Sequence, residues 1–252
     1  GSDIARYGLE TPGEVTQGAG AVAMLVSAQP RLMVLEPETS IHSEDIQDFW
    51  RPNYSKEAFA RGKYSTEQYI EFFQKTWADY RAKTGRTIAD FKALAFHLPY
   101  TKMGLKALRT ILDEGSETQQ AQLLERYAES TLYSRQIGNI YTGALYLGFL
   151  SLLEHSTNLE AGDRIGLFSY GSGAVSEFFT GILQPGFEKQ LAKQKHADLL
   201  ANRRQLTMVE YETQFQTELP EDGSEYEIDL TMDNAPIILK GVKDHERIYM
   251  TR

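Results

Sequence analysis

Apolar residues recur along the chain with two different periods, and each period predicts a different kind of element. From residue 66 to residue 84, aromatic and apolar side chains return every three or four positions and Gly85 follows, which predicts one amphipathic helix. Helices are also predicted over residues 102–112, 117–131, 140–154, 187–204 and 209–215. The segment 140–154 is strongly apolar but too short to cross a bilayer, so it is typical of a buried helix.

Continuous apolar runs bounded by glycine or proline predict buried strands. Residues 93–98 form one such run, interrupted by His97 and ended by Pro99. Residues 164–170 predict a central strand, which a Gly-Ser-Gly turn joins to a return strand over 174–183. Further strands are predicted over 226–230, 237–242 and 248–250, and the runs 18–26 and 31–35 predict two buried antiparallel strands. The alternation of strands and helices predicts an α/β fold.

Composition and charge narrow the classes of function. The chain has 26 Lys and Arg against 35 Asp and Glu, a net charge of −9, and no segment concentrates the basic residues, so we expect no nucleic-acid partner. Nothing predicts a membrane partner or an apolar leader, and we expect a cytoplasmic location. The absence of cysteine excludes disulfides and a cysteine nucleophile within these 252 residues. No spacing of His and carboxylates predicts a metal site.

Three polar residues stand where chemistry is plausible, and each has a structural alternative. His97 ends an apolar strand, and ligands of α/β proteins bind at the carboxyl ends of strands; the alternative is a core histidine bonded to backbone groups. Asn139 follows Gly138 before a buried helix, either as a ligand-binding amide or as a helix cap. Ser172 lies in a turn that suits either a carbonyl-binding site or a plain hairpin.

Five motifs in order carry a resemblance to a known family. They are SDIARY at 2–7, GEVTQGAGA at 13–21, AFHLPYTKMG at 95–104, GNIYTG at 138–143 and LFSYGSG at 167–173. With these motifs the chain closely resembles the bacterial 3-hydroxy-3-methylglutaryl-CoA synthases of the mevalonate pathway, most weakly after Glu218. The resemblance implies a thiolase-like fold, layered α/β/α/β/α from two similar halves, and a homodimer. It implies that residues 1–38 end the N-terminal half and that 39–252 form the C-terminal half.

The resemblance also implies a reaction. Members of this family acetylate a cysteine from acetyl-CoA, form an enolate with the help of a glutamate, and add it to acetoacetyl-CoA; the substrates are CoA thioesters and no cofactor is needed. Both catalytic residues precede the SDIARY motif in the family. We therefore expect this chain to be a C-terminal portion that needs the missing N-terminal segment as its partner and that is inactive alone. We also expect an exposed apolar face on its sheet and on the helix beginning at Ile140.

The family's functional residues match positions of this sequence. His97 matches the histidine that bonds the acetoacetyl ketone and protonates the alkoxide, a role suited to a group that titrates near neutrality. Asn139 and Ser172 match groups that hold the acyl part of the substrate. Other matched positions are Lys102 and Lys106 near the CoA phosphates and pantetheine channel, and Tyr7, Thr16 and Ser65 along the pocket. The resemblance predicts that His97, Asn139 and Ser172 converge.

Two other functions remain open at this point. One is the related synthase-like enzyme that installs β-branches on polyketides and takes carrier-protein substrates. The other is a non-catalytic subunit of the same fold that only binds CoA thioesters or a partner. The two lysines favour a CoA substrate.

Overall fold

The computed structural model describes residues 1–231, 233 and 235–252. Its contacts divide the chain into two compact units, Gly1–Arg203 and Arg204–Arg252. The smaller unit contains helix α7 (Met208–Gln216) and an antiparallel sheet of β10 (Tyr226–Glu227), β11 (Ile237–Lys243) and β12 (Glu246–Thr251). The larger unit contains every residue matched above to a functional position.

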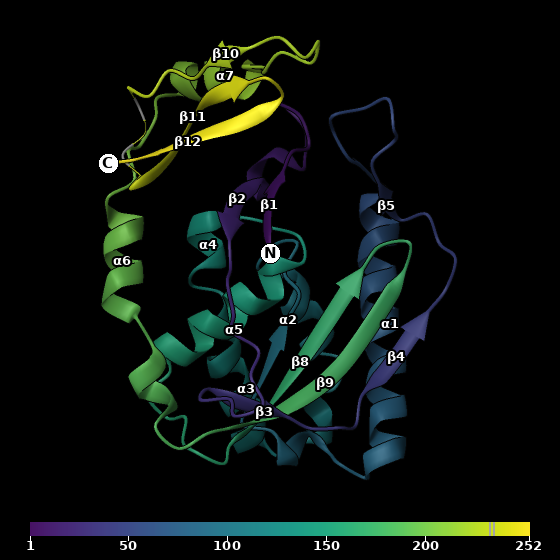
Figure 1. Ribbon diagram of the computed structural model, residues 1–252. Helices are drawn as coiled ribbons and strands as arrows, with labels where there is room; N and C mark the ends of the chain where they lie inside the picture. Colours follow the sequence, from purple (N-terminus) through teal and green to yellow (C-terminus); the bar gives the residue numbers. More distant parts are fainter. Residues whose placement is uncertain (232, 234) are drawn as a thin grey trace. The chain divides into compact units, whose positions relative to one another are not determined.

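A five-stranded mixed sheet forms the centre of the larger unit (Figure 1). Strands β3 (Met33–Leu35), β9 (Val175–Leu183), β8 (Arg164–Gly171) and β7 (Ala93–Phe96) lie in that order, and β4 (Ser40–Ser43) pairs with the first half of β9. β7 and β8 are parallel, and the other pairs are antiparallel. The carboxyl ends of β7 and β8 therefore meet at one edge of the sheet.

Helices and two small strand pairs complete this unit. The helices are α1 (Gly62–Thr84), α2 (Met103–Leu108), α3 (Glu117–Ser130), α4 (Ser134–Ile137), α5 (Gly143–His155) and α6 (Lys193–Ala201), with 3-10 turns at Glu14–Thr16, Ile88–Asp90, Leu112–Glu114 and Phe187–Gln190. β1 (Ser2–Ala5) pairs with β2 (Gly18–Ala21), and β5 (Phe49–Trp50) pairs with β6 (Phe59–Ala60). Among the described residues, no helix is both long and apolar enough to span a bilayer.

Strand β7 of the central sheet is buried on both faces. Leu94 and Phe96 of β7 belong to the apolar cluster that contains the α1 side chains, whereas Ala93 and Ala95 belong to the cluster that contains those of α5. Successive side chains of a strand point to opposite faces, so a strand covered on both sides needs an unbroken apolar run. This requirement explains why 93–98 is apolar except at His97. The mixed α/β fold expected from the sequence is confirmed.

The prediction of two buried antiparallel strands near the N-terminus is wrong. Residues 18–21 pair with β1 and residues 33–35 pair with β9, so the two runs do not pair with each other. Residues 22–29 form no strand, and Met24, Leu25 and Val26 are 55%, 82% and 92% exposed. An apolar run indicates that a segment is suited to burial, but the partner that covers it is set elsewhere in the fold.

Other differences are smaller. The segment 187–204 contains a 3-10 turn and then α6, and the helix expected from residue 140 begins at Gly143 after the unpredicted α4. α5 is covered within the chain, with Leu145 and Leu152 almost fully buried, so the expectation of an exposed apolar face on this helix is wrong. On the sheet, Leu35 of β3 and Ile41 of β4 are 60% and 59% exposed, as expected. The boundary after residue 38 stays a prediction about a larger fold; within this chain, β3 shares a sheet with β7–β9.

Candidate functional site

His97 follows directly after β7, and its backbone is held on both sides. Its N–H donates to the carbonyl oxygen of Phe168 at 2.8 Å, and its carbonyl oxygen accepts from the hydroxyl of Tyr69 at 2.7 Å. The residue is 9% exposed, and its ring has no hydrogen bond to any residue that the structure describes. The alternative of a core histidine bonded to backbone groups therefore does not hold for the ring. Its N–H remains available to a ligand.

The protonation state of His97 differs from the expectation. Burial lowers the pKa of the imidazole from its ordinary 6.5 to about 4. The prediction that His97 titrates near neutrality is therefore wrong. A charged imidazolium at this buried position would lose its hydration without gaining a charged or hydrogen-bonding partner. At pH 7 the ring is neutral and acts as a hydrogen-bond donor, not as a cation.

Asp48 joins two residues that the sequence placed in the pocket. Its carboxyl oxygen Oδ2 accepts hydrogen bonds from Ser65 at 3.0 Å, from Tyr170 at 2.9 Å and from Ser172 at 2.9 Å. The residue is fully buried, and no described group binds its other oxygen, Oδ1. Burial, followed by the hydrogen bond to Asp48, raises the pKa of Tyr170 far above its ordinary value, so that hydroxyl stays protonated and keeps donating.

Asn139 lies in a second cluster with two other predicted residues. Its side-chain nitrogen donates to the hydroxyl of Tyr7 at 2.7 Å, and its backbone N–H donates to the carbonyl of Thr16 at 3.1 Å. The Thr16 hydroxyl donates to Gly13, so Thr16 acts here through its backbone. Burial raises the pKa of Tyr7, and its oxygen accepts hydrogen bonds from Asn139 and Tyr141. Its own proton has no acceptor among the described residues.

Tyr141 is the strained member of this cluster. Its φ is +49°, in the left-handed region that side chains other than glycine rarely adopt, and its N–H donates to the side-chain oxygen of Asn139 at 2.9 Å. Burial and the neighbouring Tyr7 raise the pKa of Tyr141, so its hydroxyl is neutral and donates to Tyr7. Asn139 accepts from the backbone of Tyr141 in a local turn and orients Tyr7 through its amide. The expectation that it caps the following helix is wrong, because α5 begins after Thr142 without a side-chain cap. Its role as a ligand-binding amide stays a prediction.

Packing connects His97 with Ser172. The Tyr69 ring, whose hydroxyl bonds the backbone of His97, lies 5.3 Å from the Tyr170 ring between centroids. Tyr170 and Ser172 then donate to the same oxygen of Asp48. His97 and Ser172 follow the parallel strands β7 and β8, so they share the carboxyl edge of the sheet.

The same network reaches Asn139. Phe49 follows Asp48, and its ring lies 5.9 Å from the Tyr7 ring, with the two rings packed edge to face. Tyr7 in turn bonds Asn139. The three predicted residues are therefore linked through aromatic rings around one end of the sheet; their convergence on a shared ligand atom stays a prediction.

The two predicted lysines lie at the start of α2 and within it, shortly after the histidine strand. Lys102 precedes the helix and is exposed. The exposed Lys106 donates from Nζ to the hydroxyl of Tyr100 at 3.0 Å, and its ammonium lies 5.4 Å from the centre of that ring. Two exposed ammonium groups one helical turn apart suit the binding of phosphate.

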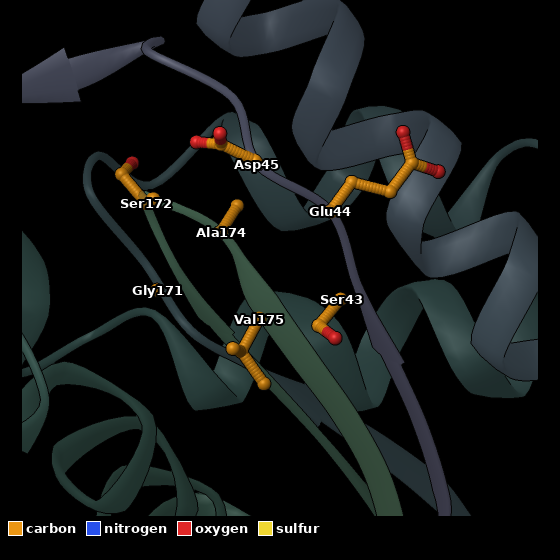
Figure 2. A pocket seen from close by; sticks show the side chains of 8 residues that line it. Ser43, Glu44, Asp45, Gly171, Ser172, Ala174 and Val175 are labelled. Atoms are coloured by element: carbon orange, nitrogen blue, oxygen red, sulfur yellow. The ribbon is translucent and has the colours of Figure 1, made fainter.

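A hollow of about 540 Å³ borders the β8–β9 turn (Figure 2). It is lined by Ser43, Glu44, Asp45 and residues 171–175. The carboxylate of Asp45 makes this hollow a poor site for phosphate groups, whereas that of Glu44 is paired with Lys75, and neither His97 nor Asn139 lines the hollow. Ser172 therefore borders the hollow, while its hydroxyl proton is directed to Asp48. Across the described residues, no three His, Asp or Glu side chains are arranged to hold a metal ion.

Sequence reasoning missed Asp48 and Tyr141. Nothing in the sequence distinguishes Asp48 from the nearby acids Glu44 and Asp45, because its three donors come from other parts of the chain. Tyr141 lies inside a motif that was recognised, and its strain became visible only in the backbone.

Comparisons with known proteins agree with the resemblance. The family model described as "Hydroxymethylglutaryl-coenzyme A synthase C terminal" matches residues 115–222. The hydroxymethylglutaryl-CoA synthase of Enterococcus faecalis is 51% identical over 88% of this chain and 58% of its own length. The polyketide biosynthesis 3-hydroxy-3-methylglutaryl-ACP synthase of Bacillus subtilis is 29% identical over 99% of this chain and 63% of its own length.

A solved structure gives the same result for the fold. The crystal structure of an HMG-CoA synthase complexed with CoA is 46% identical and superposes with a TM-score of 0.94, covering 100% of this chain and 65% of that chain. The thiolase-like fold expected from the motifs is thereby confirmed. The chain spans roughly three fifths of the length of these relatives.

Proposed function

The chain belongs to the hydroxymethylglutaryl-CoA synthase family, and on that premise we propose that it carries the half of the active site that binds acetoacetyl-CoA. The reaction is the Claisen-type condensation of acetyl-CoA with acetoacetyl-CoA and water to give 3-hydroxy-3-methylglutaryl-CoA and free CoA: CoA leaves when the cysteine is acetylated, and water cleaves the cysteine thioester after the carbon–carbon bond forms. The observation that carries the proposal is a buried histidine with an unused ring N–H, linked through packed aromatic rings to Tyr7, which has an unused hydroxyl proton.

In the proposal, the hydrogen-bond donors of the site bind one part of the substrate and its hydrogen-bond acceptors bind another. His97 and Tyr7 offer protons, so in the proposal they bind the ketone oxygen. Ser65 and Ser172 give their protons to Asp48, so their oxygens remain only as acceptors. Such acceptors suit the amide N–H groups of the pantetheine arm. Lys102 and Lys106 then suit the phosphates at the far end of CoA.

The chemical step places negative charge where the donors are. The enolate carbon of an acetyl thioester attacks the ketone carbon, a carbon–carbon bond forms, and the π pair moves to the ketone oxygen. One preorganised donor at such an oxygen typically stabilises the transition state by about 3 kcal/mol. A neutral imidazole does not readily release its N–H proton, so we assign the proton that completes the hydroxyl to an acid on another polypeptide segment.

The acetylated thiol must come from polypeptide outside these 252 residues, because they contain no cysteine. The exposed run Met24–Leu25–Val26 supports a partner segment that covers it. We include a homodimer, a cytoplasmic location and a reaction without further cofactors in the proposal, on the strength of the resemblance.

Binding and turnover test the proposal separately. Titration calorimetry of the 252-residue chain should show acetoacetyl-CoA binding more tightly than CoA, and His97→Gln should remove that preference while CoA binding persists. Lys195→Ala, an exposed change without a described partner, serves as the control. Equal affinity of the wild type and His97→Gln for acetoacetyl-CoA would contradict the assignment.

Turnover should require the nucleophile. With labelled acetyl-CoA and acetoacetyl-CoA, the purified chain alone should form no product. Addition of the cysteine-bearing segment of the Enterococcus synthase that this chain does not span should restore product formation. Condensation by the chain alone would refute the proposed division of labour.

A carrier-protein substrate is the second candidate, favoured by the 29% identity to the Bacillus ACP synthase over 99% of this chain. The exposed lysines Lys102 and Lys106, at the start of α2 and within it, favour CoA. Competition between acetoacetyl-CoA and an acetoacetylated acyl carrier protein distinguishes the two candidate substrates. If CoA is the substrate, acetoacetyl-CoA should bind more tightly, and Lys102→Ala and Lys106→Ala should weaken its binding without changing that of the carrier protein.

A further inference from the structure

Helix α6 lies beside α4 and α5 in the larger unit, outside the site described above (Figure 1). Its first contact is with Glu154 at the end of α5. The His196 Nδ1 bonds both carboxyl oxygens of Glu154 at 2.9 and 3.0 Å, and the backbone N–H of Ala192 donates to one of them at 2.9 Å. The Glu154 side chain is completely buried.

Glu154 binds the start of α4 at the same time. The hydroxyl of Tyr133, a residue only 4% exposed, donates to the other carboxyl oxygen. Burial raises the pKa of Glu154, but the hydrogen bonds from Tyr133, His196 and Ala192 outweigh burial and leave that pKa below its ordinary value. The carboxylate is therefore charged and joins two helices that are far apart in sequence.

A second contact is made two residues beyond the end of α6. The guanidinium of Arg203 donates to the carbonyl oxygen of Gln136 at 2.6 Å, near the end of α4. Leu200 packs against the main apolar cluster between these two contacts. His196 of α6, through Glu154, and Arg203, just beyond α6, thus connect this segment to both ends of a four-residue helix that has too few internal hydrogen bonds to be stable by itself.

The end of α4 leads directly into the site. Gly138 closes the helix, and Asn139 follows with its side chain on Tyr7. A shift of α4 would move Asn139 relative to Thr16 and Tyr7. We propose that α6 is a strap that positions Asn139 for the thioester, with His196 and Arg203 as its positioning residues; this deepens the proposed function and rests on it.

Paired substitutions test the strap. His196→Ala removes the donor to Glu154, whereas His196→Asn places an amide N–H close to the position of Nδ1. We expect His196→Ala and Arg203→Ala each to weaken acetoacetyl-CoA binding about fivefold and to accelerate amide hydrogen exchange over residues 134–141. His196→Asn should return both measurements to within about twofold of the wild type. Lys195→Ala, on the exposed side of α6, should change neither.

The outcomes separate the strap from the proposed function. The strap is refuted if His196→Ala leaves exchange over 134–141 unchanged, or if exchange rises equally throughout the unit, which would indicate general destabilisation. If the wild type fails to bind acetoacetyl-CoA, the proposed function fails, and a local rise in exchange that His196→Asn reverses still supports the strap. If His97→Gln removes the preference for acetoacetyl-CoA while His196→Ala does not weaken acetoacetyl-CoA binding, the function stands and the strap is refuted.

Discussion

The Ser172 hydroxyl proton is already donated to Asp48, and this hydrogen bond decides what the residue can offer a ligand. A hydroxyl has one proton, so Ser172 can accept from a substrate but cannot stabilise an oxyanion in this arrangement. Tyr7 is the opposite case, because its oxygen accepts from Asn139 and Tyr141 and its proton remains free. Residue type predicted a polar contact at both positions. Whether each hydroxyl donates to a ligand or accepts from it depends on its hydrogen-bond partners within the protein.

The lowered pKa of His97 makes a prediction about stability and pH. Between about pH 6.5 and pH 4 the unfolded chain protonates this residue while the folded chain keeps it neutral, so the unfolded state binds more protons. This contribution is fully present above pH 6.5 and is lost as the pH falls towards 4. From pH 7.5 to pH 5, urea unfolding should show the wild type losing about 2 kcal/mol more than His97→Gln. Equal losses in the two proteins would contradict the neutral imidazole.

Substitution of Asp48 should also reduce the free energy of unfolding by a few kcal/mol. Asp48→Asn leaves three hydroxyl donors facing a neutral amide and should reduce the free energy of unfolding by about 3 kcal/mol. Ser65→Ala removes one donor and should reduce it by about 1 kcal/mol. Chemical denaturation measures both. A stable Asp48→Asn variant would show that the carboxylate is not the centre of this network.

Long helices were predictable from the sequence because their own residues specify them. α1 begins within four residues of its predicted start, since its aromatic residues repeat with the period of a helix and Gly85 adopts the left-handed C-terminal conformation. α4 has only four residues, too few to show any period. The strand at 18–21 was placed in the correct segment with the wrong partner, because pairing depends on residues outside it.

Gly138 tests how strictly this local geometry is required. Its φ is +81°, and a Cβ there would lie 2.0 Å from the carbonyl oxygen of Gln17. Gly138→Ala should therefore lower the free energy of unfolding by at least about 3 kcal/mol, through backbone strain and the clash together. Gly85→Ala is the matched control, with φ of +70° and open space around it, and should cost about 1 kcal/mol. If thermal or urea unfolding gave similar losses of stability for the two variants, the clash with Gln17 would not contribute.

At the scale of the molecule, the order of motifs predicted more than any single pattern did. His97, Asn139, Ser65 and Ser172 were all named from the sequence, and contacts through Asp48, Phe49 and Tyr69 now link them. Asp48 itself could not be ranked above other acids, because its importance comes from three donors that only the fold assembles. The exposed position of residues 24–26 was equally invisible, since an apolar run has the same composition whether or not its covering segment is present.

Residues 24–26 therefore make the last prediction, at the scale of assembly. Leu25 and Val26 are 82% and 92% exposed, so they contribute little to the stability of the chain but present an apolar segment to other molecules. The chain alone should self-associate in sedimentation velocity at tens of micromolar, and Leu25→Lys with Val26→Lys should suppress association while changing the free energy of unfolding by less than about 0.5 kcal/mol. Val15→Lys, at an isolated apolar residue that is 91% exposed, is the control and should leave association unchanged. The same double variant should also prevent the cysteine-bearing segment from restoring turnover; full restoration would show that this run is not where the missing polypeptide binds.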